Sequence, residues 1–124
     1  MKTILVVDDE PAILDLLTTL LHGEGFRVLS AADGAAALER LGREGVDVVI
    51  TDGMMPRLGG VALIRAMRER PETREVPVIL VSAALKPLLE GLGPCRFLPK
   101  PFDLNAILAT ITRALGQSPS RVQE

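Results

Sequence analysis

Several features that mark other protein classes are missing from this 124-residue sequence. It contains no tryptophan or tyrosine and only three phenylalanines, and its 14 basic residues are interspersed with 16 acidic ones. Proteins that bind nucleic acid usually carry a basic stripe or a platform of aromatic side chains, and neither pattern is present. We therefore expect no direct binding to nucleic acid.

Long apolar runs and paired cysteines are also missing. No apolar run approaches the roughly 20 residues that a membrane span requires, and the first strand-like run begins within a few residues of Met1. We therefore expect no signal peptide and no membrane association. The single cysteine, Cys95, excludes an internal disulfide and fits a reducing compartment, so we expect a cytoplasmic protein.

Length and composition predict one domain. The chain has a net charge of -2 and is 48% hydrophobic. At this length a chain buries about two thirds of the surface that its unfolded form exposes, which leaves no room for a second domain. We place the domain at residues 1–116. Residues 117–124 are polar, and we expect them to form a flexible tail.

Apolar runs alternate with helical repeats along the chain. Five runs have the length and residue types of buried strands: 4–7, 26–30, 46–51, 77–81 and 97–98. Apolar residues recur at helical spacing in four longer segments: 11–22, 33–43, 61–70 and 103–115. Because the strands are apolar on both faces, this alternation predicts a doubly wound α/β fold with a five-stranded parallel sheet.

The predicted helices carry recognisable start and stop signals. Pro11 suits a first helical turn, and Asp33 and Asp103 suit the capping position before a helix. Gly23 and Gly116 follow the last apolar positions of the first and last helices.

A fifth helix is expected between the last two strands, and it is short. Only residues 86 to about 92 have a helical pattern, and Pro87 can occupy only the first turn. Between the fourth and fifth strands lie Pro87, Gly91, Gly93 and Pro94, all of which disfavour a longer helix. We therefore predict five helices, of which the fourth is shortened.

Polar side chains stand where four of the strands end. Asp8 and Asp9 follow the first strand, Asp52 the third, Ser82 the fourth and Lys100 the fifth. In an open parallel sheet these ends meet at one crevice. Three carboxylates that meet there repel one another, and a hard divalent cation such as Mg²⁺ allows them to stay ionised together. The sequence predicts a cation site beside a reactive carboxylate.

Each of these residues has an ordinary structural role when it is taken alone. Asp9 could cap the helix that follows it, and Asp52 could open a turn with the glycine after it. Ser82 could be a loop hydroxyl, and Lys100 a solvated charge. Their common position at strand ends favours a shared site over four coincidences.

Four segments resemble the motifs of response-regulator receiver domains, the phosphoacceptor modules of two-component signalling. They are LVVDDEP at 5–11, VVITDGMMP at 48–56, VILVSA at 78–83 and FLPKPFD at 97–103. The resemblance covers residues 3 to about 115. It implies a flavodoxin-like sheet with the strand order 2-1-3-4-5.

The resemblance also implies a role for each acidic residue of the site. Asp52 would accept a phosphoryl group from a histidine kinase. Asp9 would bind Mg²⁺ directly, and Asp8 would bind it through water or as a second carboxylate. Asp52 itself and the backbone carbonyl of Met54 would complete the protein ligands.

The remaining site residues would respond to the phosphoryl group. Lys100 would pair with it, with its position set by a cis peptide bond to Pro101. Ser82 would donate a hydrogen bond to it. Phe97 occupies the aromatic switch position and would move together with Ser82, although it lacks the hydroxyl that a tyrosine offers.

The implied function is signalling. We expect a protein that catalyses only its own phosphorylation and dephosphorylation and that is otherwise not an enzyme. Its partners would be a sensor histidine kinase or a phosphotransfer protein, and an unidentified downstream protein. The shortened fourth helix weakens the inference about the usual output face, so we expect a monomer.

Three alternatives remain open. A degenerate receiver would act only as a protein-interaction module, which the complete set of acids, serine and lysine disfavours. An aspartate-nucleophile phosphatase of the haloacid-dehalogenase kind places an Asp-x-Asp pair after its first strand, whereas Asp8 and Asp9 are adjacent. A dinucleotide-binding domain requires a glycine-rich turn after the first strand, and residues 8–11 contain no glycine.

Overall fold

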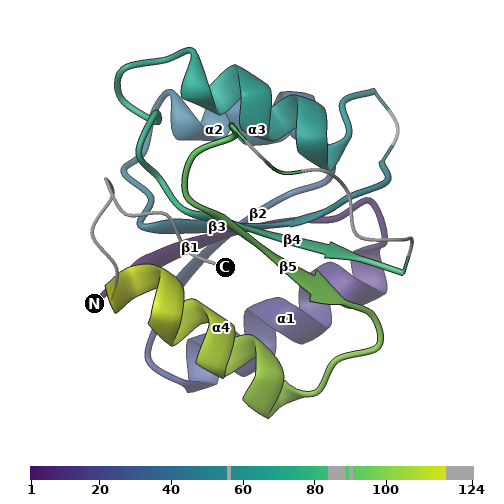
Figure 1. Cartoon of the computed structure of the whole chain (residues 1–124). Coiled ribbons are helices and arrows are strands. Elements are labelled where there is room, and N and C mark those ends of the chain that lie inside the picture. The colour runs from purple at the N-terminus through teal and green to yellow at the C-terminus, as the bar shows by residue number, and fades with distance from the viewer. Residues whose placement is uncertain (56, 84–88, 90, 117–124) are drawn as a thin grey trace.

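The computed structural model describes residues 1–55, 57–83, 89 and 91–116, which form a parallel sheet of five strands in the order β2-β1-β3-β4-β5 with helices on both faces (Figure 1). The strands are β1 (Thr3–Val7), β2 (Arg27–Ala31), β3 (Val48–Asp52), β4 (Val78–Ser82) and β5 (Cys95–Pro99). The helices are α1 (Pro11–Gly23), α2 (Gly34–Leu41), α3 (Gly60–Arg68) and α4 (Leu104–Gly116). The predicted doubly wound fold and strand order are confirmed.

The predicted short helix at residues 86 to about 92 falls mostly outside the described residues, and the predicted tail at 117–124 falls entirely outside them. The described part of the chain contains four helices, so the last helix predicted from the sequence is α4. None of these helices is long and apolar enough to cross a membrane.

Each strand differs from its predicted bounds, by one residue in β1, β2 and β4 and by two residues at the start of β3 and β5. β3 begins at Val48 rather than at residue 46, because the preceding Asp47 uses its side chain to accept the Thr3 N–H at 2.7 Å. β5 is longer than the two residues expected, because all five of its residues pair with β4. The start of β3 and the length of β5 thus depend on residues of neighbouring strands. Those residues are distant in the sequence.

Alternating side chains of the strands build a separate apolar layer on each face of the sheet. In β1, Leu5 and Val7 pack with residues of α2 and α3, whereas Ile4 and Val6 pack with residues of α1 and α4. All four are buried. Burial of each such side chain contributes about 1.5–3 kcal/mol, so both layers are needed to hold the sheet between its helices.

Side-chain caps start two of the helices as predicted. Asp33 Oδ1 accepts the Ala36 N–H at 2.8 Å before α2, and Asp103 Oδ1 accepts the Ala106 N–H at 2.8 Å before α4. α1 begins differently, with Pro11 in its first turn and Glu10 at the capping position without a side-chain hydrogen bond. Asp9 therefore does not cap α1, and its carboxylate is available for another role.

Arg68, at the end of α3, ties together the segments that lead into β4 and β5. Its guanidinium donates to the carbonyl oxygens of Leu92 at 2.6 Å, Val76 at 2.7 Å and Pro94 at 3.0 Å. Desolvation by burial lowers the pKa of this side chain. These contacts hold the amino-terminal ends of β4 and β5 together, at the edge of the sheet opposite Asp52.

The first residue of α3 approaches the backbone of β3 very closely. A Cβ atom at Gly60 would lie 2.6 Å from the Asp52 carbonyl oxygen and 2.5 Å from Leu80 Cδ1. The Gly60 N–H donates to the Gly53 carbonyl at 3.2 Å. Only glycine allows α3 to begin this close to the strand end that carries Asp52.

We predict that Gly60→Ala lowers the free energy of unfolding by about 1–3 kcal/mol, because the added methyl group forces the helix away from the backbone of β3. Gly45→Ala is the matched control, since a Cβ there meets no atom within 4 Å. Urea denaturation measures both. Equal stability of the two variants would show that α3 can shift without cost.

Candidate functional site

The site lies at β1 and β3, where the order in which successive strands join the sheet reverses. β1 pairs with β2 on one side and with β3 on the other. The chain leaves β1 toward α1 on one face and leaves β3 toward α3 on the opposite face (Figure 1). Such a point opens a crevice at the carboxyl ends of the strands, which is where doubly wound proteins bind ligands.

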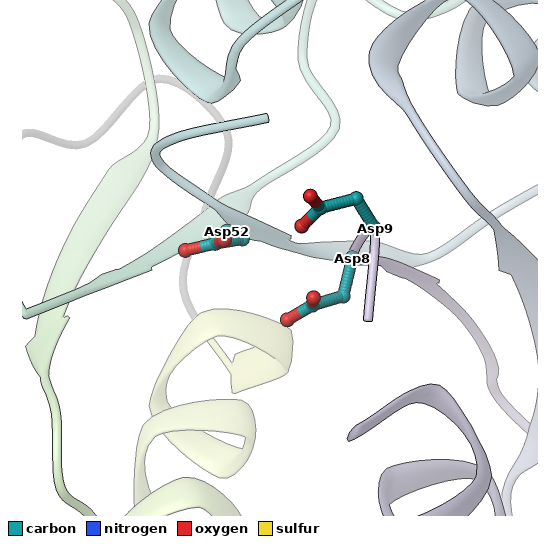
Figure 2. Close-up of side chains that lie close together, drawn as sticks. All are labelled: Asp8, Asp9 and Asp52. Carbon is teal, nitrogen blue, oxygen red and sulfur yellow. The ribbon is translucent and has the colours of Figure 1, made fainter. Parts of the chain in front are cut away.

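Three carboxylates meet at these strand ends, as predicted from their positions in the sequence. Oxygen atoms of Asp8, Asp9 and Asp52 all lie within 4.8 Å of one another. Figure 2 shows Asp8 and Asp9 side by side at the end of β1, with both side chains directed toward Asp52 at the end of β3. Asp8 is buried, Asp52 is partly buried and Asp9 is exposed.

Burial and crowding make Asp8 harder to ionise. Desolvation raises its pKa above the ordinary 3.8, and the carboxylates of Asp52 and Asp9 raise it further. The Glu10 N–H, which donates to Asp8 Oδ1 at 2.9 Å, and the Lys100 ammonium act in the opposite direction. The net effect is a raised pKa, in a cluster where three carboxylates outnumber one ammonium group.

The donor set fits a small, hard divalent cation. All three side chains offer carboxylate oxygens, the ligands that Mg²⁺ prefers, and about 4 Å separates oxygens on opposite sides of an octahedral Mg²⁺. The carboxylate oxygens of the three aspartates lie within 4.8 Å of one another, which is close to that spacing. A cation here would offset both causes of the raised pKa of Asp8, which are burial first and the repulsion of the neighbouring carboxylates second.

Lys100 approaches Asp52 from the end of β5. Its Nζ lies 3.5 Å from Asp52 Oδ1, and its backbone N–H donates to the Ser82 carbonyl at 2.9 Å. The peptide bond between Lys100 and Pro101 is cis, which confirms the prediction for this bond. The lysine is therefore a partner of Asp52 rather than a solvated charge.

Ser82 and Phe97 share one face of the sheet near this site. Ser82 is buried at the end of β4, and a Cβ atom at Gly53 would lie 3.4 Å from its Oγ. In the register of β4 and β5, Leu80 pairs with Phe97 and Ser82 pairs with Pro99. Phe97 thus lies two positions from the serine along the same face, where it packs against the apolar layer below α2 and α3.

Met54 lies in the loop that follows β3. The residue is 71% exposed. It is two residues from Asp52, which keeps its backbone near the carboxylates. Its role as a carbonyl ligand stays a prediction.

The structure also brings together two residues that sequence reasoning did not connect. Arg57, in the same loop as Met54, forms an ion pair with Asp33, with Nε of the arginine 3.1 Å from Oδ2 of the aspartate. Asp33 was expected only to cap α2. The two residues are 24 positions apart, and no local pattern signals their contact.

Comparison with known proteins agrees with this geometry. The sequence profile described as "Response regulator receiver domain" matches residues 4–112. The transcriptional regulatory protein CpxR of Escherichia coli (strain K12) is 38% identical over 123 residues, which are 95% of this chain and 51% of CpxR. The response regulator GtcR of Aneurinibacillus migulanus is 39% identical over 121 residues, which are 94% of this chain and 49% of GtcR. The chain spans about half the length of these relatives.

Solved structures of single receiver domains match over nearly their whole length. Chemotaxis protein CheY4 of Vibrio cholerae superposes with a TM-score of 0.87 at 29% identity, covering 93% of this chain and 99% of that one. The receiver domain of a sensor histidine kinase from Pseudomonas aeruginosa PAO1, which holds a magnesium ion in its active-site cleft, superposes with a TM-score of 0.84 at 28% identity. That match covers 94% of this chain and 98% of the other. This chain therefore belongs to the family of response regulator receiver domains of two-component systems.

Proposed function

We propose that this receiver domain accepts a phosphoryl group on Asp52 from a histidine kinase or a phosphotransfer protein, in a reaction that requires Mg²⁺. The observation that carries the proposal is the setting of Asp52, whose carboxylate meets the Lys100 ammonium and the carboxylates of Asp8 and Asp9. A nucleophile, a fixed cation and a set of metal ligands are what phosphoryl transfer needs.

The chemistry has two steps. An oxygen of Asp52 attacks the phosphorus, the bond from phosphorus to the histidine nitrogen breaks, and the nitrogen keeps the electron pair. Water later attacks the acyl phosphate, which releases inorganic phosphate and restores the carboxylate. Because the protein modifies only itself, we propose no enzymatic activity on other substrates.

The acidic residues would hold the metal ion. We assign Asp9 and Asp52 as direct ligands, Asp8 as a ligand directly or through water, and Met54 as a ligand through its carbonyl. Bound Mg²⁺ supplies positive charge to the oxygens of the phosphoryl group. The magnesium ion in the similar receiver domain from Pseudomonas aeruginosa supports this assignment.

Lys100, Ser82 and Phe97 would respond to the phosphoryl group. The Lys100 ammonium, already 3.5 Å from Asp52 Oδ1, would pair with a phosphoryl oxygen. The Ser82 hydroxyl would turn to donate to another, and Phe97 would move into the space beside it. This change is the signal that we propose a downstream protein reads.

We further propose that residues 1–116 act as a cytoplasmic, monomeric domain without direct contact with nucleic acid or membranes. The interspersed charges and the single cysteine support this setting. The alternatives of a haloacid-dehalogenase phosphatase and a dinucleotide-binding domain find no support in the family match. A degenerate receiver that acts only as a protein-interaction module is disfavoured, because the acids and the lysine meet in one site.

The phosphoacceptor can be tested directly. We predict that the wild type gains one phosphoryl group when it is incubated with acetyl phosphate and Mg²⁺, and that Asp52→Asn gains none, because the amide cannot attack phosphorus. Intact-mass spectrometry measures the gain. Asp15→Asn, which changes an exposed acid of α1, is the control and should be modified like the wild type. An acid-labile phosphate on Asp52→Asn would refute the assignment.

Mg²⁺ should stabilise the fold, because a ligand at ten times its dissociation constant adds about 1.4 kcal/mol to the free energy of unfolding. Asp8→Asn should stabilise the metal-free protein and reduce the gain from Mg²⁺. The raised pKa of Asp8 means that its ionised form is less favourable in the fold than in the unfolded chain. The cost of ionising Asp8 in the fold is absent at a pH below the pKa of Asp8 in the unfolded chain. It is complete at a pH above the pKa of Asp8 in the folded chain.

The advantage of Asp8→Asn over the wild type should therefore grow in EDTA as the pH rises above 3.8, the ordinary pKa of the carboxyl group, and it should vanish below that pH. Thermal melting with EDTA and with millimolar Mg²⁺ measures both effects. Identical melting temperatures of the wild type under the two conditions would contradict the metal site.

Ser82→Ala should still accept phosphate but should not transmit the change to Phe97. The hydroxyl that turns toward the phosphoryl oxygen is absent, so the ring gains no space. Resonances near Phe97, followed by nuclear magnetic resonance with beryllofluoride as the phosphoryl mimic, report this step. The coupling is wrong if these resonances shift equally in the wild type and in Ser82→Ala.

A further inference from the structure

Arg57 has a backbone conformation that is unusual for a large side chain. Its φ is +71°, and it is the one residue other than glycine with a positive φ in the described part of the chain. The left-handed region is unfavourable for residues with a Cβ, so a bulky residue stays there only when its surroundings impose it. An outlier of this kind next to a functional site suggests a functional constraint.

The surroundings of Arg57 include a carboxylate that is itself fixed. Besides the 3.1 Å contact between Nε and Asp33 Oδ2, Nη2 of the arginine lies 3.5 Å from Asp33 Oδ1. The Asp33 side chain is only 15% exposed, and its Oδ1 accepts the Ala36 N–H at the start of α2. The helix cap thus holds the carboxylate in place for the guanidinium.

A second contact joins the same loop to α2. The Gly34 N–H donates to the Leu58 carbonyl at 3.2 Å, and a Cβ atom at Gly34 would lie 2.5 Å from that oxygen. The Leu58 side chain packs against the apolar layer below α2 and α3. Residues 57 and 58 are therefore anchored to the amino-terminal end of α2.

The other end of the loop is anchored to the sheet. The Gly53 N–H donates to the Val81 carbonyl at 2.9 Å, and the Gly53 carbonyl accepts the Gly60 N–H. Met54 lies between these two sets of contacts. Its side chain is exposed and does not fix the backbone by packing. The contacts that flank Met54 along the chain are therefore those of Gly53 on one side and those of Arg57 and Leu58 on the other.

We propose that Asp33 and Arg57 are positioning residues for the metal site, and that their ion pair fixes the loop so that the Met54 carbonyl is presented to the cation held by Asp8, Asp9 and Asp52. The inference rests on the proposed function of that site. The pair would act on the metal ligands from outside, since Asp33 is not one of the three carboxylates that could hold the ion. Residues of this kind, which orient ligands from outside, tune metal affinity.

Arg57→Gly should lower metal affinity without lowering stability. Arg57→Gly relieves the strained backbone, so the unfolding midpoint in EDTA should stay the same or rise. The ion pair is partly exposed, with 66% of the arginine side chain accessible, so its loss costs little stability by itself. The loop loses a contact with α2, however, and Mg²⁺ affinity should fall by about tenfold.

The experiment compares five variants with the wild type, using isothermal titration with MgCl₂ and thermal melting in EDTA. Asp33→Ser keeps a capping oxygen for α2 but is too short to reach Arg57, so it should weaken Mg²⁺ binding as Arg57→Gly does. The double variant should be no weaker than either single one, because both remove the same contact. Arg57→Lys, which keeps the charge, should restore part of the affinity. Arg43→Gly, which removes an exposed charge beyond α2, should bind Mg²⁺ like the wild type.

The outcomes separate this inference from the proposed function. Wild type that binds no Mg²⁺ would overturn the metal site itself. Wild type that binds Mg²⁺, with Arg57→Gly and Asp33→Ser binding it equally well, would overturn only the positioning role. A parallel loss of melting temperature and affinity in Arg57→Gly would also overturn it, since that result assigns the pair to general stability.

Discussion

Electrostatic repulsion among three carboxylates is the constraint on which the rest of this structure depends. Parallel strands bring Asp8, Asp9 and Asp52 to the same edge of the sheet, and partial burial strengthens their repulsion. The fold must supply the stability that this edge lacks. An apolar layer on each face of the sheet supplies this stability. Arg68 adds to it by donating hydrogen bonds to backbone carbonyls at the opposite edge. The charged edge can therefore be kept for chemistry.

The parts of the site differ in how firmly they are held. Asp8 is fixed by the Glu10 N–H, Asp52 by the register of β3, and Lys100 by the Ser82 carbonyl. All of these constraints come from strands or from residues next to them. The loop after β3 has less support, because Gly53 has no side chain and Gly59 starts α3 without a side-chain cap. Contacts with α2 and the close approach of Gly60 to β3 take the place of that support.

Much of this arrangement could be predicted from the sequence, for identifiable reasons. The strands are apolar on both faces and the helices repeat their apolar residues at helical spacing, so the doubly wound fold follows from periodicity. Asp33 and Asp103 were predicted as caps because capping is a contact over three residues. The association of Asp8, Asp9 and Asp52 was also predictable, because parallel strands end at a common edge. The alternative that Asp9 caps α1 was wrong, since Glu10 occupies that position.

Contacts between distant segments were decided only by the tertiary structure. Nothing in the local sequence around Arg57 indicates Asp33, and nothing around Arg68 indicates the carbonyls of residues 92 and 94. The ends of β3 and β5 likewise depended on partners in other strands. By itself the sequence determined which segments form strands and helices and which polar residues stand at strand ends, because those properties depend on neighbours along the chain. The distances among these residues, their burial and the pKa of Asp8 depend on how the layers pack, so only the folded chain decided them.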